Sequence, residues 1–272
     1  MPELPEVETT RRGIAPHLVG RCIARTVVRE PRLRWPVPVA ALSAADGARI
    51  EAVERRAKYL LLRTTAGTIM LHLGMSGSLR VIATTEPPFV HDHFDLELDN
   101  GQCLRLRDPR RFGSVHWLPA GAEPEHALLA SLGPEPWDST FNGEYLHRRA
   151  RGRRRSVKAF LMDSQVVVGV GNIYANEALF AAGIHPARAA GRVSRARYES
   201  LAGHVRAILE RAIEVGGTTL RDFTDGAGEP GYFRIELAVY GRTGECCPAC
   251  STPLRTLRQD QRSTWYCPRC QR

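Results

Sequence analysis

Apolar and polar positions alternate over most of the first 118 residues, with the two-residue period of β-strands. A helix precedes these strands, because Val7, Ile14 and Leu18 share one face of a helix that runs from Pro5 to about Leu18. Asn100-Gly101 is a strong hairpin turn signal between two of the strands. Strands are expected at residues 23–28, 57–63, 68–73, 94–98 and 103–107. Antiparallel strands with such short turns predict a sandwich or barrel-like sheet domain.

The apolar spacing becomes helical in the second half of the chain. The segment Leu132–Trp137 carries two prolines and a glycine and is the expected interdomain linker. Helices are predicted over residues 156–163, 172–182 and 194–215, and glycines follow the last two. The sequence thus predicts an α+β multidomain protein. Its expected parts are an N-terminal β-sandwich domain with flanking helices (1–132), a helical domain (133–235) and a small metal module (236–272).

The charge of the chain favours a polyanionic partner. The chain has 38 Lys and Arg against 29 Asp and Glu, a formal net charge of +9. Such an excess favours nucleic acid, although a basic solubilising surface would look similar. Residues 147–158 include six arginines and one lysine. This density suits phosphate binding, with a solvated charge run as the alternative.

The N-terminus and the apolar runs bear on location. No apolar run approaches the roughly 18 residues of a membrane span. The first ten residues are acidic and lack the apolar stretch of a secretory signal. We therefore expect a cytoplasmic protein, whose thiols stay reduced and whose cysteines need an explanation other than disulfides.

Five of the seven cysteines fall in the last 27 residues. Cys247-Pro-Ala-Cys250 and Cys267-Pro-Arg-Cys270 are separated by 16 residues, which is the spacing of a four-thiolate zinc site on a β-hairpin. Two redox dithiols are the alternative, but no thioredoxin-like pattern surrounds either pair. We predict one structural Zn²⁺ ion. The cysteines expected to have no ligand role are Cys22, Cys103 and Cys246.

A glycine-containing turn, Val168–Gly171, leads into the predicted helix at Asn172. Asn172 is a favoured N-cap residue, and the amides at such a helix start can receive a phosphate. Because a helix is predicted just before this turn, the segment predicts a helix–turn–helix arrangement. Short glycine turns before helices are common, so this signal is weak alone.

Five motifs occur in order along the chain: PELPEVET at 2–9, HLGMSG at 72–77, DPRRFG at 108–113, GVGNIYANEAL at 169–179, and the four-cysteine finger. Together they closely resemble bacterial formamidopyrimidine-DNA glycosylases, also called 8-oxoguanine DNA glycosylases, over essentially the whole chain. PELPE rather than PEGPE at the start favours this family over its relative endonuclease VIII. The resemblance implies a helix-two-turn-helix DNA-binding domain and a terminal zinc-finger β-hairpin.

The resemblance implies a base-excision-repair enzyme that acts as a monomer on double-stranded DNA containing 8-oxoguanine or formamidopyrimidines. It implies that Met1 is removed and that the amine of Pro2 attacks the sugar to form a Schiff base. A terminal amine titrates near pH 8, so a useful fraction is unprotonated at neutral pH. Glu3 would move protons, Lys58 in the strand 57–63 would assist elimination, and Arg262 would assist the second elimination. The strand is then nicked by β,δ-elimination.

The target nucleotide must leave the duplex, since an N-terminal amine cannot reach a stacked base. By resemblance, Met75, Arg110 and Phe112 fill the vacated stack, and Arg110 bonds the orphaned cytosine. The DNA-binding residues that the resemblance implies are His72, His91, Arg110, Arg153, Asn172 and Tyr240. The implied damaged-base pocket includes Lys158, Thr218 and Thr219.

Several of these residues have ordinary structural interpretations when taken singly. Met75 and Phe112 would more often be core, and His91 could make a structural hydrogen bond beside Asp92. Two alternative functions also remain at this point. One is an endonuclease VIII-like enzyme for oxidised pyrimidines, and the other is a non-catalytic damage-binding zinc protein. The presence of Pro2, Glu3 and Lys58 together argues against the second.

Overall fold

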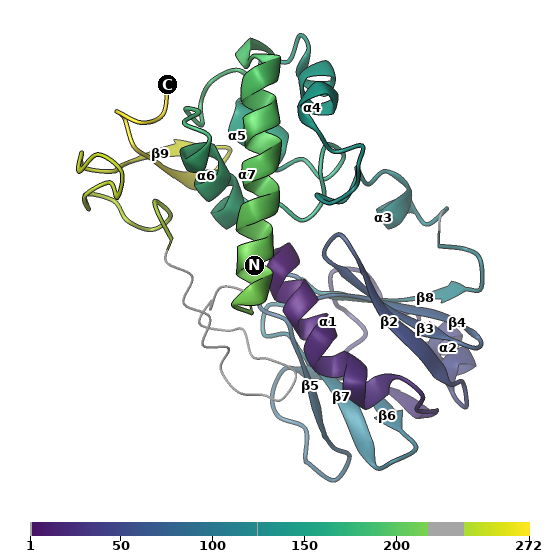
Figure 1. Ribbon diagram of the computed structural model, residues 1–272. Coiled ribbons are helices and arrows are strands. Elements are labelled where there is room, and N and C mark those ends of the chain that lie inside the picture. The colour runs from purple at the N-terminus through teal and green to yellow at the C-terminus, as the bar shows by residue number, and fades with distance from the viewer. Residues whose placement is uncertain (1, 124, 217–236) are drawn as a thin grey trace. The chain divides into compact units, whose positions relative to one another are not determined.

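The computed structural model describes residues 2–123, 125–216 and 237–272, which fall into two compact units. The first unit contains the chain up to Ala130, drawn from purple through blue to teal in Figure 1. The second contains Ser131–Glu214 and the described residues from 237 onward. Each unit is described by itself.

Two four-stranded antiparallel sheets form the sandwich of the first unit (Figure 1). Their inner faces share one buried core, in which Leu60 and Leu71 of one sheet join Leu96 and Leu104 of the other. The expected β-sandwich is confirmed. The strands of one sheet, in spatial order, are β1 (Ile23–Val28), β6 (Asp92–Leu98), β7 (Gln102–Arg107) and β5 (Ser78–Ala83). Those of the other are β2 (Ile50–Arg56), β3 (Tyr59–Thr64), β4 (Gly67–His72) and β8 (Ser114–Pro119).

Helices flank the sandwich as predicted. Helix α1 (Leu4–Leu18) starts in a capping box, in which Glu3 N donates to Glu6 Oε2 at 2.8 Å. Val7, Ile14 and Leu18 are buried in the sandwich core, so the apolar face read from the sequence is the packed one. This packing anchors the N-terminal residues to the sheets. The short elements of the unit are α2 (Val39–Leu42), the 3-10 turn Ser43–Ala45 and α3 (Ala127–Ala130).

One strand boundary was predicted wrongly, with a consequence for the site. Ala57 and Lys58 form the two-residue turn of the β2–β3 hairpin, since Arg56 pairs with Tyr59. Ala57 adopts a left-handed conformation with φ 55°. Neither residue is a glycine or asparagine, so the usual hairpin signal is missing. Lys58 therefore lies at a hairpin tip and not within a strand.

The second unit is helical and ends in a hairpin. Helix α7 is amphipathic and buries Tyr198, Leu201, Val205 and Leu209. Ser156 caps α5 by accepting from Ala159 N at 3.2 Å. The elements are α4 (Gly143–Ala150), α5 (Val157–Leu161), α6 (Asn172–Ala181), the 3-10 turn Ala190–Arg192, α7 (Arg195–Glu214), β9 (Arg255–Gln259) and β10 (Arg262–Tyr266).

The capping assignment at α6 was wrong. Gly171 is the N-cap, with extended backbone angles, and Asn172 is the first helical residue. The side chain of Asn172 instead donates to Ser263 O at 3.2 Å. Tertiary contact thus competes with local capping for this side chain. Within the described ranges, no helix is both long and apolar enough to cross a membrane.

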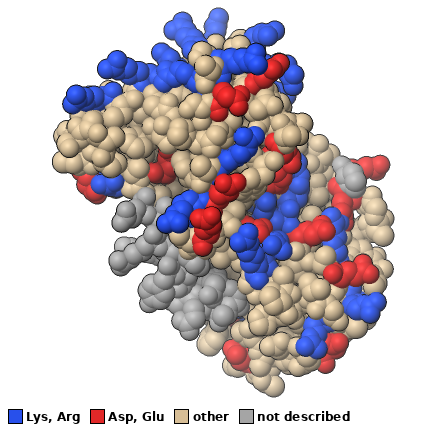
Figure 2. Space-filling model, in the orientation of Figure 1, with Lys and Arg blue, Asp and Glu red and all other residues tan. Residues whose placement is uncertain are grey.

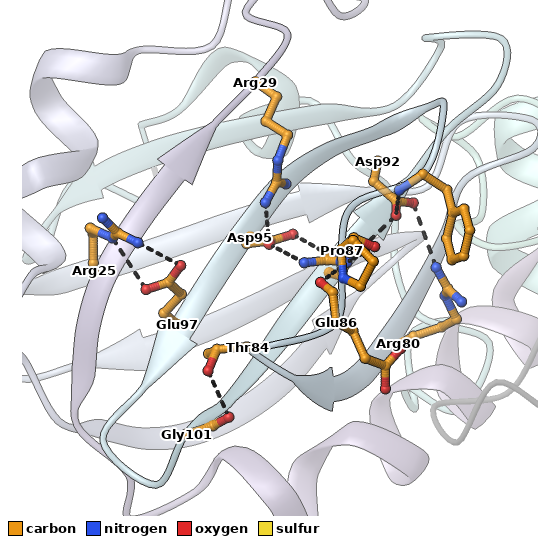
Figure 3. Close-up of polar contacts among 12 residues, drawn as sticks. Arg25, Arg29, Arg80, Thr84, Glu86, Pro87, Asp92, Asp95, Glu97 and Gly101 are labelled. Carbon is orange, nitrogen blue, oxygen red and sulfur yellow. Dashed lines mark hydrogen bonds and ion pairs between the residues drawn. The ribbon is translucent and has the colours of Figure 1, made fainter.

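A buried ionic network lies on the outer face of the β1-β6-β7-β5 sheet (Figure 3). Arg105 is 2% exposed and donates to both oxygens of Asp95, at 2.9 and 2.8 Å. Arg29 adds a third hydrogen bond at 2.6 Å. Burial opposes ionisation of Asp95, but these hydrogen bonds outweigh it and lower its pKa. Arg105 also donates to the carbonyl oxygens of Glu86 and Pro87, which fixes the loop before β6.

We predict that Arg105→Met destabilises the protein by about 3–5 kcal/mol, because the buried carboxylate of Asp95 loses two of its three arginine hydrogen bonds and keeps only the one from Arg29. The matched control is Arg25→Met. Arg25 also makes two hydrogen bonds to a carboxylate, Glu97, but its side chain is 65% exposed, so its loss should destabilise the protein far less than the loss of Arg105. Urea unfolding of both variants measures the difference, and equal losses would contradict the structural role of Arg105.

Candidate functional site

The N-terminal residues are buried at the start of α1. Pro2 is buried, Glu3 is 2% exposed and Glu6 is fully buried. The capping box holds Glu3 at the positive end of the helix dipole. Glu3 thus caps α1, and its carboxylate lies one residue from the predicted nucleophile. Met1 lies outside the described residues.

His72 ends β4 and is a neutral hydrogen-bond donor. Burial, followed by the positive charges of Lys58, Arg34 and His116, lowers the pKa of His72 to about 4. Gly74 N donates to its Nδ1 at 2.9 Å, so the ring proton of the neutral imidazole lies on Nε2. Two predicted residues, Lys58 and His72, are thus brought together in the first unit. The pair offers a phosphate one cation and one neutral N–H donor.

The carboxylate of Asp108 joins two loops that carry predicted site residues. Asp108 is fully buried, and it accepts from Ser76 Oγ at 2.9 Å and from Gly113 N at 2.7 Å. Ser76 Oγ in turn accepts from Arg110 N at 3.2 Å. The loop with Met75 is thereby fixed against the loop with Arg110 and Phe112. Neither Asp108 nor Ser76 was identified from the sequence as a site residue, although both lie inside the motifs.

Met75 and Phe112 are not core residues, since their exposed fractions are 39% and 40%. The guanidinium carbon of Arg110 lies 4.9 Å from the centre of the Phe112 ring, in a cation–π contact. Apolar side chains that are exposed to water are unfavourable unless a ligand covers them. Here they lie on the same two loops as the cation of Arg110. This arrangement suits insertion into a base stack.

Gly74 explains why the two loops can approach so closely. Its φ is +64°, and a Cβ there would lie 2.3 Å from the backbone carbon of Phe112. Gly113 makes a similar approach, with a Cβ position 2.7 Å from His72 O. Glycine is required at both positions because backbone occupies the space of a side chain. The close approach of the HLGMSG and DPRRFG segments therefore depends on these two glycines.

His91 precedes β6 on the loop that Arg105 fixes. Its ring is exposed and its φ is +78°. The structural hydrogen bond that the sequence allowed for His91 is made instead by its two neighbours. Asp92 Oδ2 accepts from Phe89 N at 2.9 Å, and His93 Nε2 lies 2.9 Å from Asp108 O. A binding role for His91 stays a prediction, supported by this exposure.

In the second unit, three side chains hold strand β10, on which Arg262 lies. Lys158 Nζ donates to Ser263 O at 3.1 Å and to Thr264 Oγ1 at 2.6 Å. Asn172 Nδ2 donates to the same Ser263 carbonyl, and Asn176 Oδ1 accepts from Trp265 N at 2.9 Å. The exposed Arg262 is thus placed next to the start of α6.

Lys158 itself is 2% exposed, and its ammonium group is engaged with the hairpin. Its role beside a damaged base stays a prediction. Thr218 and Thr219, the other residues of that predicted pocket, lie outside the described residues.

Glu177 of α6 was missed at the sequence level. Its carboxylate accepts from the backbone N–H groups of Ala238, Val239 and Tyr240, at 2.7, 3.0 and 2.8 Å. These bonds fix the chain just before the metal module. The ring of Tyr240, a predicted DNA contact, packs at 4.4 Å between centroids against Trp265. The sequence signal that could have identified Glu177 is the presence of a glutamate within the apolar run Ile173–Leu179.

The basic segment 147–158 covers the end of α4, the following loop and the start of α5. Arg153 is exposed in this loop, with its N bonded to Ala150 O at 2.9 Å. Figure 2 shows Lys and Arg crowding the end of the second unit where α4 and the start of α7 lie in Figure 1. Residues 151–155 are thus exposed, whereas Lys158 is buried, and no carboxylate pairs with Arg153 among the described ion pairs.

The four predicted cysteine ligands meet in one cluster, with all Sγ atoms within 4.8 Å of one another. Cys247 and Cys270 Sγ are 3.9 Å apart, and Cys250 and Cys267 Sγ are 3.5 Å apart. A tetrahedral zinc site with bonds of about 2.3 Å has sulfur separations of roughly 3.8 Å, so the cluster fits Zn²⁺. Four protein thiolates leave no open position, so the predicted single structural zinc is confirmed.

We predict that Gly74→Ala destabilises the protein by about 1–3 kcal/mol more than Gly101→Ala. Both glycines have positive φ, at +64° and +77°, so each alanine carries the left-handed strain of roughly 1–2 kcal/mol. Only Gly74 has backbone in the Cβ space, whereas nothing lies within 4 Å at Gly101. Urea unfolding measures both, and equal losses would rule out the proposed collision.

We predict that Cys267→Ala loses zinc during dialysis against a chelator, whereas Cys246→Ala keeps it, because Cys246 is exposed and lies outside the cluster. Metal analysis of both purified variants and of the unaltered chain measures this. Retention of zinc by Cys267→Ala would show that the ion is held elsewhere.

Comparison with known proteins agrees with this geometry. Residues 1–115 match the formamidopyrimidine-DNA glycosylase N-terminal domain, residues 132–224 match the H2TH domain of the same enzymes, and residues 244–272 match a zinc finger found in FPG and IleRS. The formamidopyrimidine-DNA glycosylase of Alkalilimnicola ehrlichii is 63% identical, with all of both chains covered.

Solved structures show the same likeness. MutM (Fpg) from Thermus thermophilus has a TM-score of 0.88 and 40% identity, covering 99% of this chain and 98% of its own. Lactococcus lactis Fpg, solved in complex with abasic-site DNA, has a TM-score of 0.92 and 31% identity, covering 99% of both chains. The chain belongs to the formamidopyrimidine-DNA glycosylase family.

Proposed function

We propose that the chain is a bifunctional DNA glycosylase and abasic-site lyase of base-excision repair. It removes oxidised purines, namely 8-oxoguanine and formamidopyrimidines, from double-stranded DNA. The observation that carries the proposal is the placement of Pro2 and Glu3 at the buried start of α1, in a unit that also holds Lys58 beside His72 and the exposed Met75 and Phe112. The relatives' name, and the abasic-site DNA in the Lactococcus lactis structure, support it.

The first step forms one bond and breaks one. After removal of Met1, the secondary amine of Pro2 attacks C1′ of the damaged nucleotide, and the C1′–base bond breaks with its electron pair leaving on the base. Glu3 handles protons at the sugar, as general acid or base. Because the nucleophile is a secondary amine, opening of the sugar ring leaves a positively charged iminium between Pro2 and C1′.

The iminium makes strand cleavage possible. Loss of a proton from C2′ moves an electron pair toward the iminium, and the bond from C3′ to its phosphate oxygen breaks. A second elimination breaks the bond from C5′ to the other phosphate. Lys58 assists the first elimination and Arg262 the second, and both cations stabilise the departing phosphates.

The remaining predicted residues bind and distort DNA. His72, His91, Arg153, Asn172 and Tyr240 contact phosphates or sugars on the flanking strand. Met75, Arg110 and Phe112 fill the stack that the flipped nucleotide leaves, and Arg110 bonds the orphaned cytosine. Lys158, Thr218 and Thr219 belong to the damaged-base pocket. The zinc held by the four cysteines keeps the β9–β10 hairpin rigid and takes no part in the chemistry.

Three parts divide this work: a catalytic sandwich (1–132), a helix-two-turn-helix domain (133–235) and the zinc finger (236–272). The enzyme acts as a monomer on chromosomal DNA in the bacterial cytoplasm.

We predict that borohydride traps a covalent adduct on duplex DNA with one 8-oxoguanine opposite cytosine, and that mass spectrometry maps it to Pro2. The Pro2→Gly variant replaces the secondary amine by a primary amine and should reduce the yield of the trapped adduct. Glu3→Gln should slow base release by about 10²-fold or more while binding persists, because general acid–base catalysis contributes that much.

Lys58→Gln is the control for the nucleophile, since it should still form the adduct and lose mainly the elimination. An adduct that maps to Lys58 would contradict the role of Pro2. An adduct formed only on a duplex with an oxidised pyrimidine would replace the proposal with an endonuclease VIII-like activity. Binding without any adduct would identify a damage-binding protein.

A further inference from the structure

A groove of about 740 Å³ lies in the first unit, beside the proposed insertion residues. One wall is formed by residues 32–35, in the loop between β1 and α2, and the other by residues 110–112. No motif or predicted role covers residues 32–35. The loop therefore needs its own explanation.

The 32–35 loop is a built structure. Arg34 N donates to Gly113 O at 3.1 Å, and Val37 N donates to Pro31 O at 2.9 Å. Leu33 is 8% exposed and belongs to the sandwich core. These contacts fix the loop against the DPRRFG segment, yet the indole of Trp35 remains 47% exposed. A rigid loop that presents a large aromatic side chain to solvent is the first observation.

The lining is strongly basic. Four of the seven lining residues are arginines, and none of the seven, all described, is acidic. Glu30, just outside, accepts from Arg32 Nε at 2.8 Å and from Arg111 Nη1 at 3.3 Å, which ties the two walls together. Hydrogen bonds from Arg32 lower the pKa of Glu30 to about 2, so these pairs stay ionised. Arg34 adds a positive charge close to His72.

Aromatic side chains complete the pattern. Trp35 and Phe112 are both exposed, and Arg110 lies over the Phe112 ring. A basic groove with exposed aromatic rings is typical of sites for unpaired nucleotides, whose bases stack on the rings while arginines bind the phosphates. Paired bases inside a duplex offer no such face. An acidic peptide would satisfy the arginines and leave the indole without a partner.

We propose that this groove binds unpaired nucleotides of the undamaged strand opposite the lesion, with a base stacked on Trp35 and phosphates on Arg32 and Arg34. The inference rests on the proposed function, because Arg110 and Phe112 form one wall and would open the duplex at that point. Trp35 then contributes to the affinity for the opened, undamaged strand. It acts in binding and takes no part in bond cleavage.

Fluorescence anisotropy with two duplexes tests the proposal. Both carry a stable abasic analogue at the lesion position, and one has an intact opposite strand. In the other, abasic spacers replace the opposite nucleotide and its two neighbours, so that no base can stack. Trp35→Ala should bind the intact duplex about 5- to 100-fold more weakly, the worth of one stacked base, and bind the spacer duplex as the unaltered chain does. Trp35→Phe should keep most of the affinity.

Two matched controls accompany these variants. Trp137 is also exposed, at 36%, but lies in the second unit outside the groove, so Trp137→Ala should treat both duplexes alike. Arg32→Gln should reduce the slope of log affinity against log salt by about 1, as expected for one lost phosphate contact. Arg25 makes a comparable pair with Glu97 outside the groove, and Arg25→Gln should leave the slope unchanged.

Three outcomes would overturn the proposal: no loss on the intact duplex, an equal loss on both duplexes, or competition by polyglutamate as strong as that by single-stranded oligothymidylate. Urea unfolding of each variant shows whether an equal loss comes from misfolding. The borohydride assay on the unaltered chain reports separately on the proposed function. Trapping without a Trp35 effect would reject the groove alone, and a Trp35 effect without trapping would reject the lyase alone.

Discussion

The buried carboxylate of Asp108 organises the two loops of the first unit that carry the proposed insertion residues. It accepts a hydroxyl from the Met75 loop and a backbone N–H from the Phe112 loop, and its own backbone bonds His91 O. Hydrogen bonds to a charged group contribute about 1.5–3 kcal/mol each, and an unpaired buried carboxylate would cost more. The exposed Met75, Arg110 and Phe112 can therefore remain outside the core without becoming mobile. Their rigidity before binding reduces the entropy lost when DNA binds.

A similar arrangement recurs in the second unit. There the carboxylate of Glu177 accepts three backbone N–H groups ahead of the metal module, while Lys158, Asn172 and Asn176 bind β10. Zinc fixes the hairpin internally, and these side chains fix it against α5 and α6. The position of Arg262 thus depends both on the zinc site and on the hydrogen bonds from α5 and α6. In both units, buried polar groups hold the backbone beside exposed side chains for which a DNA-binding role is proposed.

Periodicity predicted the α+β architecture well, because α1 has one apolar face and the turn between β6 and β7 carries the Asn-Gly signal. It failed at Ala57-Lys58, where a hairpin turn uses neither residue type. It also failed at Asn172, whose side chain bonds the hairpin carbonyl of Ser263 instead of capping α6. At Asn172 the deciding partner, Ser263, lies 91 residues away in the sequence. Hydrogen-bond partners distant in sequence leave no periodic trace.

The sequence by itself determined the thiolate spacing that selects zinc and the motifs that identify the family, and it predicted the chemistry of Pro2 and Glu3. These are properties of residue type and local spacing, which need no fold. Only the tertiary structure decided that Asp108 and Glu177 are organising groups, that His72 is neutral, and that Trp35 faces a basic groove. Each of these depends on burial or on contacts between distant segments, and both arise only when the chain is folded.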